Sequence, residues 1–229
     1  MIEHYLNKIT LGDSREHLAR LPNQSINLIF TDPIYDRESD YLWLAGEAKR
    51  LLKPAGLILF WSNGRWHKNN VDWMEQSGLV YRWDFACIHH AGLSPMNGKI
   101  IAKTNRLIWF DLAGDSKMID YLPDGYLSLS WLGKGRPNEH KWTKNPKYTS
   151  MAIRAFCEEG GVILDPFAGG GTNLVSALET NRQFIGFEID SHVYQIAVRR
   201  IAAAQPPLMV GISQKPQQST LFGDNDHEI

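Results

Sequence analysis

The stretch Asp32-Pro33-Ile34-Tyr35 places a carboxylate, a rigid backbone and an aromatic ring next to one another. The apolar residues before it predict a buried strand, and Pro33 ends any strand ladder because it has no N–H to donate. Open α/β sheets bind their ligands at the carboxyl ends of the strands. Alone, Asp32-Pro33 also suits a turn or a helix cap. Its position makes it a first candidate site, with a hydrogen-bond acceptor beside a flat face.

A second motif, ILDPFAGGGTN, covers residues 163–173. An apolar strand runs into Asp165, three glycines follow, and Thr172 opens a predicted helix. Glycines permit a tight turn and close approach of a ligand, but no Gly-Lys-Ser/Thr follows, which excludes a phosphate-binding P-loop. Glu188 ends the next predicted strand, at roughly the 20-residue spacing of an acid that binds ribose hydroxyls. The pairing of Asp165 with Glu188 indicates a nucleoside ligand.

The charge of Asp165 narrows that ligand. A carboxylate beside the glycines would repel a pyrophosphate and attract an ammonium or a sulfonium group. A nucleoside that carries cations and no phosphate is S-adenosylmethionine, which we therefore expect as the cofactor.

Strand-like apolar runs alternate along the chain with helix-like periodic segments, as in α/β proteins. The predicted strands are residues 26–31, 57–61, 81–89, 106–112, 162–165 and 184–188. The predicted helices are residues 14–21, 39–52 with Ser39 as the cap, 65–76, 148–158, 172–180 and 193–204. Residues 114–146 show no clean period and predict a long functional loop region. The composition of residues 205–229 is typical of a flexible tail.

The size and charge of the chain set wider limits. With 229 residues, 43% of them hydrophobic, the chain suits one domain. The net charge of −1 does not indicate a nucleic-acid binder, but a basic cluster lies between Lys134 and Lys147. Cys87 and Cys157 favour a reducing compartment. No export signal or membrane-spanning run is evident, so we expect a cytoplasmic protein.

Together these motifs resemble the β-class DNA amino-methyltransferases, which methylate N6 of adenine or N4 of cytosine. DPIY is similar to their Asp-Pro-Pro-Tyr motif, DPFAGGGT to their cofactor motif and FIGFEID to their ribose motif. The catalytic motif comes first, which is the order of the β class. The resemblance runs from about Ile9 to Tyr35, lapses, and resumes from about His140 to Ile201. It implies a Rossmann-like S-adenosylmethionine-dependent methyltransferase fold with circularly permuted motifs, a mostly parallel sheet and helices on both faces.

The resemblance also implies roles for individual residues. Asp32 and the Pro33 carbonyl would accept the N–H groups of the target amine, whose lone pair is otherwise delocalised into the base. Tyr35 would stack on a flipped base. The implied cofactor contacts are Asp13, Asp165, Phe167, Gly169, Gly171, Thr172 and Glu188, with Lys144 or Asn145 at the cofactor carboxylate. Asp13 also suits the N-cap of the helix after it. No metal is needed.

Two departures leave alternatives open. Ile34 replaces the second proline, and HKWTKNP is a poor copy of the family's His-Pro-Thr-Gln-Lys-Pro. Asp32 favours adenine N6 over cytosine N4. The other readings are an RNA or protein-amide methyltransferase, a nucleotide-dependent dehydrogenase, which Asp165 opposes, and a catalytically inactive DNA-binding homologue.

Double-stranded DNA is the partner that the resemblance implies. A single methyltransferase domain over 1–204 would carry a small target-recognition insertion at about 114–146, followed by the tail 205–229. The predicted DNA contacts are Lys134, Arg136, Lys141 and Trp142. In the tail, Gln218, Leu221 and Phe222 resemble the peptides that dock on the bacterial sliding clamp. A bacterial or phage origin and a restriction-modification role follow from the family, while the recognition sequence and a homodimer are left open.

Overall fold

The computed structural model describes residues 2–89, 95–96, 100–101, 103–128 and 144–204. The predicted DNA contacts and the predicted clamp peptide lie outside the described residues, and so does the predicted tail 205–229.

Helices and strands alternate through the described chain. The strands are β1 (Lys8–Leu11), β2 (Ile26–Thr31), β3 (Leu52–Asn63), β4 (Val80–His89), β5 (Pro95–Met96), β6 (Ile100–Ile101), β7 (Thr104–Asp111), β8 (Tyr126–Ser128), β9 (Val162–Asp165) and β10 (Gln183–Glu188). The helices are the 3-10 turn η1 (Ile2–His4), α1 (Ser14–Leu18), α2 (Glu38–Leu51), α3 (His67–Gln76), α4 (Pro146–Phe156), α5 (Thr172–Glu179) and α6 (Ser191–Ala203).

One eight-stranded sheet organises the fold, with the strand order β1-β10-β9-β2-β3-β7-β4-β8. All neighbours pair in parallel except β7, which runs antiparallel to both β3 and β4. The central neighbours β2 and β9 come from opposite ends of the chain, with Leu28 paired to Ile163 and Ile29 to Leu164. The predicted mostly parallel sheet is confirmed, and so is the Rossmann-like fold class.

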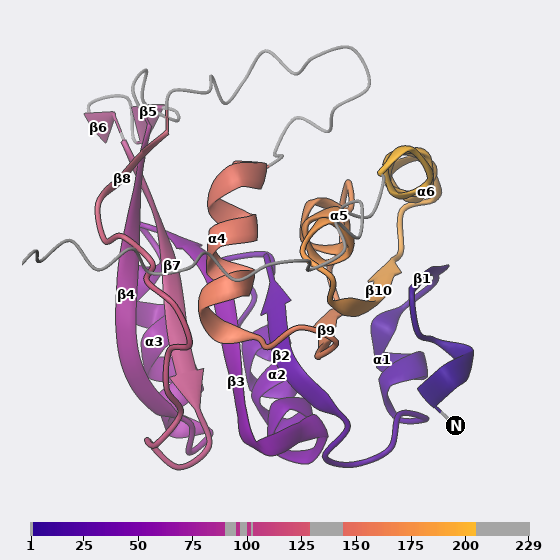
Figure 1. Ribbon diagram of the computed structural model, residues 1–229. Coiled ribbons are helices and arrows are strands. Elements are labelled where there is room, and N and C mark those ends of the chain that lie inside the picture. The colour runs from indigo at the N-terminus through magenta and orange to yellow at the C-terminus, as the bar shows by residue number, and fades with distance from the viewer. Residues whose placement is uncertain (1, 90–94, 97–99, 102, 129–143, 205–229) are drawn as a thin grey trace, which may run out of the picture.

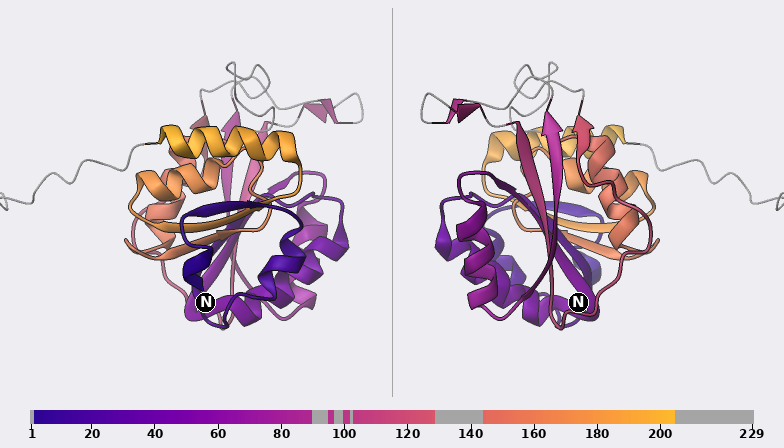
Figure 2. Two further views of the ribbon diagram at one scale, coloured as in Figure 1. Left: turned by 90° about the vertical axis from the view of Figure 1, so that its right-hand side faces the viewer. Right: turned by 90° about the vertical axis from the view of Figure 1, so that its left-hand side faces the viewer.

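Helices cover both faces of this sheet, as the two side views in Figure 2 show. On one face, α1, α2 and α3 bury apolar side chains such as Leu18, Tyr41 and Met74 against the sheet. On the other face, α4 and α5 bury residues such as Ile153 and Leu174. Helix α6 contacts α5 and β1 at the end of the sheet that Figure 1 draws in yellow and indigo. The two buried layers fix the strands, and thus the loops at their carboxyl ends.

The structure corrects several local predictions. Ser39 is not a cap: α2 begins at Glu38, and its N-cap residue Arg37 makes no capping bond through its side chain. The chain turns back just before the helix, where the Arg37 N–H donates to the Ile34 carbonyl, so the first helical turn already includes Ser39. Strand β3 begins five residues earlier than the predicted Leu57, at Leu52. The short edge strands β1 and β8 were not predicted.

The predicted insertion at 114–146 is partly built into the main domain. The Ser116 hydroxyl donates to Asp111, Leu122 is buried at 7% exposure, and Tyr126–Ser128 pairs with β4. These residues look irregular in sequence because single anchors, rather than a periodic face, hold them. Residues 114–128 therefore pack on the main sheet, and the division into domains stays a prediction.

Candidate active site

The two Asp-Pro motifs lie side by side at the carboxyl ends of β2 and β9. Asp32 directly follows β2, and Asp165 is the last residue of β9. The Thr31 hydroxyl donates to Asp165 Oδ1 over 2.7 Å, which links the two strand ends through their side chains. Segments 134 residues apart thus form one edge of the sheet, as the sequence predicted for a ligand site.

The Asp165 carboxylate is held from all sides by neutral donors. Oδ1 accepts from Thr31 and from the Phe167 N–H at 3.1 Å, while Oδ2 accepts from the Asn173 amide at 2.9 Å. Only 1% of the residue is exposed. Burial raises the pKa of Asp165 to about 7, although the three hydrogen bonds act in the opposite direction. Asp165 therefore acts as a buried clamp beneath the glycine turn, and its predicted direct contact with the cofactor stays a prediction.

Asn173 completes that clamp from helix α5. Its amide nitrogen also donates to the Phe30 carbonyl over 2.9 Å, so one side chain ties α5 to both β2 and β9. Asn173 is itself buried, at 5% exposure. Sequence reasoning missed this residue and Thr31, because nothing in either neighbourhood signals a partner so far away along the chain.

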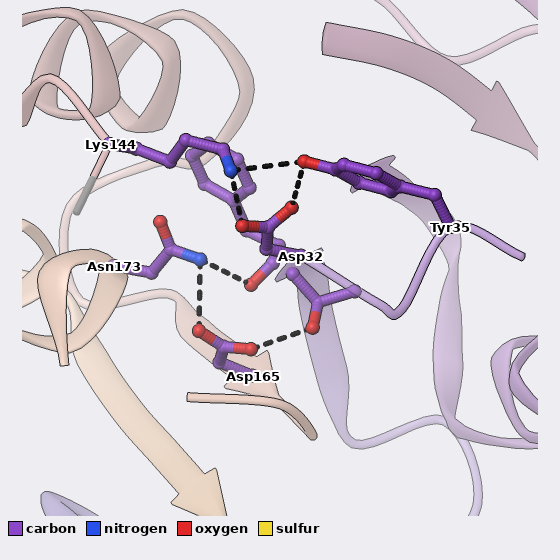
Figure 3. Close-up of polar contacts among 7 residues, drawn as sticks. Asp32, Tyr35, Lys144, Asp165 and Asn173 are labelled. Atoms are coloured by element: carbon purple, nitrogen blue, oxygen red, sulfur yellow. Dashed lines mark hydrogen bonds and ion pairs between the residues drawn. The ribbon is translucent and has the colours of Figure 1, made fainter. Parts of the chain in front are cut away.

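Asp32 has a different set of partners, drawn in Figure 3. The Tyr35 hydroxyl donates to Asp32 Oδ1 over 2.7 Å, and the Lys144 ammonium donates to Asp32 Oδ2. Lys144 Nζ also lies 3.1 Å from the Tyr35 hydroxyl oxygen, which accepts from it. Burial, and then the negative charge of Asp32, hold the pKa of Tyr35 well above its usual range. Tyr35 therefore stays protonated and donates to the carboxylate.

The Lys144 ammonium lies in an aromatic and acidic environment. Nζ is 5.7 Å from the ring centroid of Tyr35 and also 5.7 Å from that of Trp61 on β3. The Lys144 side chain is 11% exposed and the Asp32 side chain 26%. The sequence predicted Lys144 or Asn145 at the cofactor carboxylate; in this structure Lys144 contacts Asp32, and the cofactor contact stays a prediction.

A buried polar relay fixes the backbone of the catalytic motif. The Asn70 amide on α3 donates to the Tyr35 carbonyl over 2.8 Å, and the Ser62 hydroxyl on β3 donates to the Asn70 side chain over 2.6 Å. Both Ser62 and Asn70 are fully buried. Buried polar networks of this kind restrict conformation when every member is satisfied. The relay gives Tyr35 a defined position that the sequence did not reveal.

The predicted cofactor residues gather at the ends of β1, β9 and β10. The Gly169 N–H donates to Glu188 Oε2 over 2.8 Å, and the Gly12 N–H donates to the Glu188 carbonyl over 2.9 Å. Gly169 has a φ of 51°, and a Cβ on it would meet no atom within 4 Å. Gly169 of the glycine turn thus faces open space next to an acidic strand end, which fits a nucleoside ligand.

Asp13 has the capping role that the sequence predicted. Its side chain accepts from the Arg15 N–H over 2.9 Å at the start of α1. Arg15 in turn pairs with Asp40 at 2.6 Å and lies over the Trp43 ring at 5.2 Å. The Trp43 ring meets the Phe167 ring edge-on, with centroids 6.0 Å apart. Phe167 is therefore braced by α2 at the mouth of the glycine turn.

The remaining predicted residues begin helices. Gly171 precedes α5 with a φ of 77°, and a Cβ on it would lie 3.0 Å from the Ala197 Cβ, so only glycine allows this approach of α6. The Thr172 hydroxyl oxygen accepts from Arg200 over 3.1 Å. The Asn145 side chain accepts from the Tyr148 N–H over 3.1 Å as the N-cap of α4.

Comparisons with known proteins agree with this geometry. The sequence profile of a family described as DNA methylase matches residues 126–199. The type II methyltransferase M.BglII of Bacillus subtilis is 27% identical over 258 residues, which cover 89% of this chain and 71% of that protein. The chain is thus similar over most of its length to a DNA methyltransferase, and the family matched by residues 126–199 uses S-adenosylmethionine.

Solved structures with the same fold support the assignment of the fold. The M1.HpyAVI complex with S-adenosylmethionine has a TM-score of 0.71 at 20% identity, over 85% of this chain and 98% of that one. The PvuII DNA methyltransferase, described as cytosine-N4-specific, has a TM-score of 0.72 at 20% identity, over 84% of this chain and 85% of that one.

Two further findings concern membrane-spanning helices and metal-binding groups. Within the described ranges, no helix is long and apolar enough to cross a membrane. In the same part of the chain, no three His, Cys, Asp or Glu side chains form a group that could hold a metal ion.

Proposed function

We propose that this enzyme transfers a methyl group from S-adenosylmethionine to N6 of a flipped adenine in DNA. One observation carries the proposal: the acceptor Asp32 and the cofactor turn at Asp165 stand on adjacent strands, joined by the Thr31–Asp165 hydrogen bond of 2.7 Å. A target amine at Asp32 and a cofactor at the glycine turn would therefore meet at one edge of the sheet. When bound, the cofactor supplies an electrophilic methyl group on a sulfonium.

Asp32 and Pro33 prepare the amine. Its lone pair is conjugated with the base, so the N–H bonds must be drawn out of the ring plane before the nitrogen reacts. The Asp32 carboxylate accepts one N–H and the Pro33 carbonyl accepts the other. Both acceptors also stabilise the positive charge that grows on the nitrogen in the transition state, which is where their effect on the rate arises.

Tyr35 places the base. Its hydroxyl is bound to Asp32 at 2.7 Å and its carbonyl to Asn70 at 2.8 Å, so the ring is held at both ends. A fixed aromatic face next to the amine acceptors suits stacking of an extrahelical base. Because both reactants are oriented by groups that are already in place, little motion is needed at the moment of transfer.

The cofactor side is assigned from the same edge. The proposal gives Glu188 the ribose hydroxyls and Asp13 the adenine amine. The sequence predicted Lys144 or Asn145 at the cofactor carboxylate, and the proposal keeps Asn145, whose side chain is held as the N-cap of α4 by the Tyr148 N–H at 3.1 Å. Phe167 lines the mouth of the turn, where Trp43 braces it.

Adenine is preferred over cytosine because the motif begins with an acid. Cytosine N4 is the alternative target, and the likeness in fold to a cytosine-N4-specific enzyme supports it. Both products come from the same chemistry on an exocyclic amine. The two bases differ in size and ring nitrogens, so base analysis separates the alternatives directly.

The test is transfer of a tritiated methyl group to unmodified genomic DNA, followed by nucleoside analysis. We expect label in N6-methyladenine. Label in N4-methylcytosine would correct the target base and retain the mechanism. Label that appears only when RNA or protein is supplied, or no label at all with cofactor bound, would contradict DNA methylation. The Asp32→Ala variant serves as the control for background transfer.

A further inference from the structure

The Lys144 ammonium occupies the very acceptor that the proposed function gives to the target amine. It donates to Asp32 Oδ2 and lies 3.1 Å from the Tyr35 hydroxyl. The Tyr35 and Trp61 ring centroids are each 5.7 Å away. The side chain is 11% exposed, so most of its contacts are with protein.

This environment suits a nitrogen that carries N–H donors and positive charge. A carboxylate strengthens hydrogen bonds from a charged donor, and aromatic faces attract a cation. The target amine gains the same character during methyl transfer, when its nitrogen becomes positively charged. The pocket that holds Lys144 therefore has the chemistry required by the transition state.

We propose that Lys144 is a positioning residue that stands in for the target amine at Asp32 and must leave before the base enters. While no DNA is bound, its ammonium keeps the Asp32 carboxylate and the Tyr35 hydroxyl in their working arrangement. When a base flips in, its amine takes over the bond to Asp32. This inference rests on the proposed function, because it assumes that Asp32 accepts the target amine.

Simultaneous occupancy by both nitrogens is unfavourable. The ammonium takes one acceptor position of Asp32 Oδ2, and its full charge repels the positive charge that grows on the amine nitrogen at the same carboxylate. The other oxygen, Asp32 Oδ1, already accepts from Tyr35 at 2.7 Å. A base stacked on Tyr35 would also need the space beside that ring, near which the ammonium lies. Base entry therefore requires exchange rather than addition.

Exchange takes the Lys144 side chain away from Asp32. The neighbouring Asn145 caps α4, and this cap anchors the backbone next to Lys144. The contact between Lys144 and Asp32 lowers the apparent affinity for DNA, because only those enzyme molecules in which Lys144 has left Asp32 can accept the base. A charge-assisted hydrogen bond of this kind corresponds to roughly a tenfold to hundredfold reduction.

The first experiment compares Lys144→Met with Lys147→Met. Lys147 is exposed on the first turn of α4, so its substitution removes one positive charge near the site without touching Asp32. Steady-state methyl transfer to unmethylated genomic DNA is measured over a range of DNA concentrations. We expect the KM for DNA to fall about tenfold in Lys144→Met relative to Lys147→Met. Lys144→Arg, which still pairs with a carboxylate, should keep the KM at or above that of the wild type.

The second experiment needs no catalysis. A double-mutant cycle of Lys144→Met with Asp32→Asn is followed by urea unfolding of the DNA-free enzyme. We expect the two substitutions to be coupled, by about tenfold in the unfolding equilibrium constant. Additive effects would show that the contact does not exist in solution and would overturn the proposal.

Two kinetic outcomes would also overturn it. One is an unchanged or raised KM for DNA in Lys144→Met. The other is a large loss of kcat at constant KM, which would place Lys144 in the chemical step. A wild type that binds cofactor yet transfers no methyl group to DNA would instead contradict the proposed function itself, and the two failures are distinguishable on that basis.

Discussion

Two Asp-Pro pairs end adjacent strands of this enzyme, and they differ in nearly every physical respect. Asp165 is 1% exposed and is bound by a hydroxyl, an amide and a backbone N–H, all of them neutral. The Asp32 side chain is 26% exposed and is bound by a phenol and an ammonium. The same dipeptide at the same edge therefore supports two environments, one closed and one open to exchange.

The difference follows from what comes next in the chain. After Asp165, a glycine turn leads directly into α5, whose Asn173 folds back over the carboxylate. After Asp32, the chain continues through an exposed Ile34 to Tyr35, and within the described residues no helical side chain bonds to the acid. A closed carboxylate stabilises the strand junction, whereas an open one remains available to a substrate. The predictions below separate these roles, from the largest expected effect to the smallest.

Asp32→Ala should abolish most methyl transfer while cofactor binding survives. Loss of a group that stabilises developing charge costs about a hundredfold to a thousandfold in rate. Transfer of tritiated methyl to DNA gives the rate, and calorimetric titration gives the cofactor affinity. Asp36→Ala, at an exposed acid nearby, is the matched control. Near-normal activity in Asp32→Ala would remove this residue from the mechanism.

Asp165→Ala should chiefly affect stability. It leaves the Thr31 hydroxyl and the Phe167 N–H without their acceptor in a buried position, and unpaired buried donors cost about 1–3 kcal/mol each. We expect a loss of about 2–4 kcal/mol in the free energy of unfolding, measured with urea and tryptophan fluorescence. Asp32→Ala should cost clearly less in the same assay. The reverse order would contradict the division between a closed and an open carboxylate.

Asp165→Asn should change how stability depends on pH. The pKa of Asp165 is raised from an unfolded value near 4 to about 7, so between these values the folded protein holds a proton that the unfolded chain has released. The wild type therefore loses stability as pH rises through this window, by up to about 1.4 kcal/mol per pH unit from this group. The asparagine variant lacks this term. Urea unfolding at pH 5 and pH 7 should show that the free energy of unfolding of Asp165→Asn rises relative to that of the wild type as pH rises. An equal change in both proteins would count against the raised pKa of Asp165.

Ile34→Pro should have the smallest effect. Ile34 is 46% exposed and contributes no side-chain hydrogen bond, so proline removes flexibility rather than chemistry. We expect activity within about threefold of the wild type and a change in stability below about 1 kcal/mol. Methyl-transfer assays and urea unfolding check both values. A large loss of activity would indicate that the open loop depends on the conformational freedom of residue 34.

The sequence predicted the regular core well where local signals were strong. Strands β2 and β9 have the predicted bounds, because each is a short apolar run that ends at an acid and a proline. Strand β1 escaped prediction because it is short and none of its residues is fully buried. Helix α2 starts one residue before the predicted cap, because a backbone turn at Arg37 outweighed the preference of serine for that position.

The location of the site at the carboxyl ends of the strands was predictable from the sequence, but its side-chain contacts were not. Both motifs, Asp13 as a cap and the strand-end position of Glu188 were accessible from local sequence. The pairing of Lys144 with Asp32 spans 112 residues, and that of Thr31 with Asp165 spans 134. No pattern within either segment indicates such partners. Only the fold decides which side chains meet.

The junction of β2 with β9 has a consequence for how the enzyme is made. Strand β2 emerges from the ribosome early, yet its neighbour β9 follows more than a hundred residues later. Strand β1 likewise cannot pair until β10 has been synthesised. Closing loops of that length is entropically costly, and contacts that are distant in sequence slow folding. The nascent chain thus carries its catalytic motif without a cofactor turn beside it for most of translation. Under the proposed function, a chain interrupted before β9 lacks the sheet edge at which the base and the cofactor would meet.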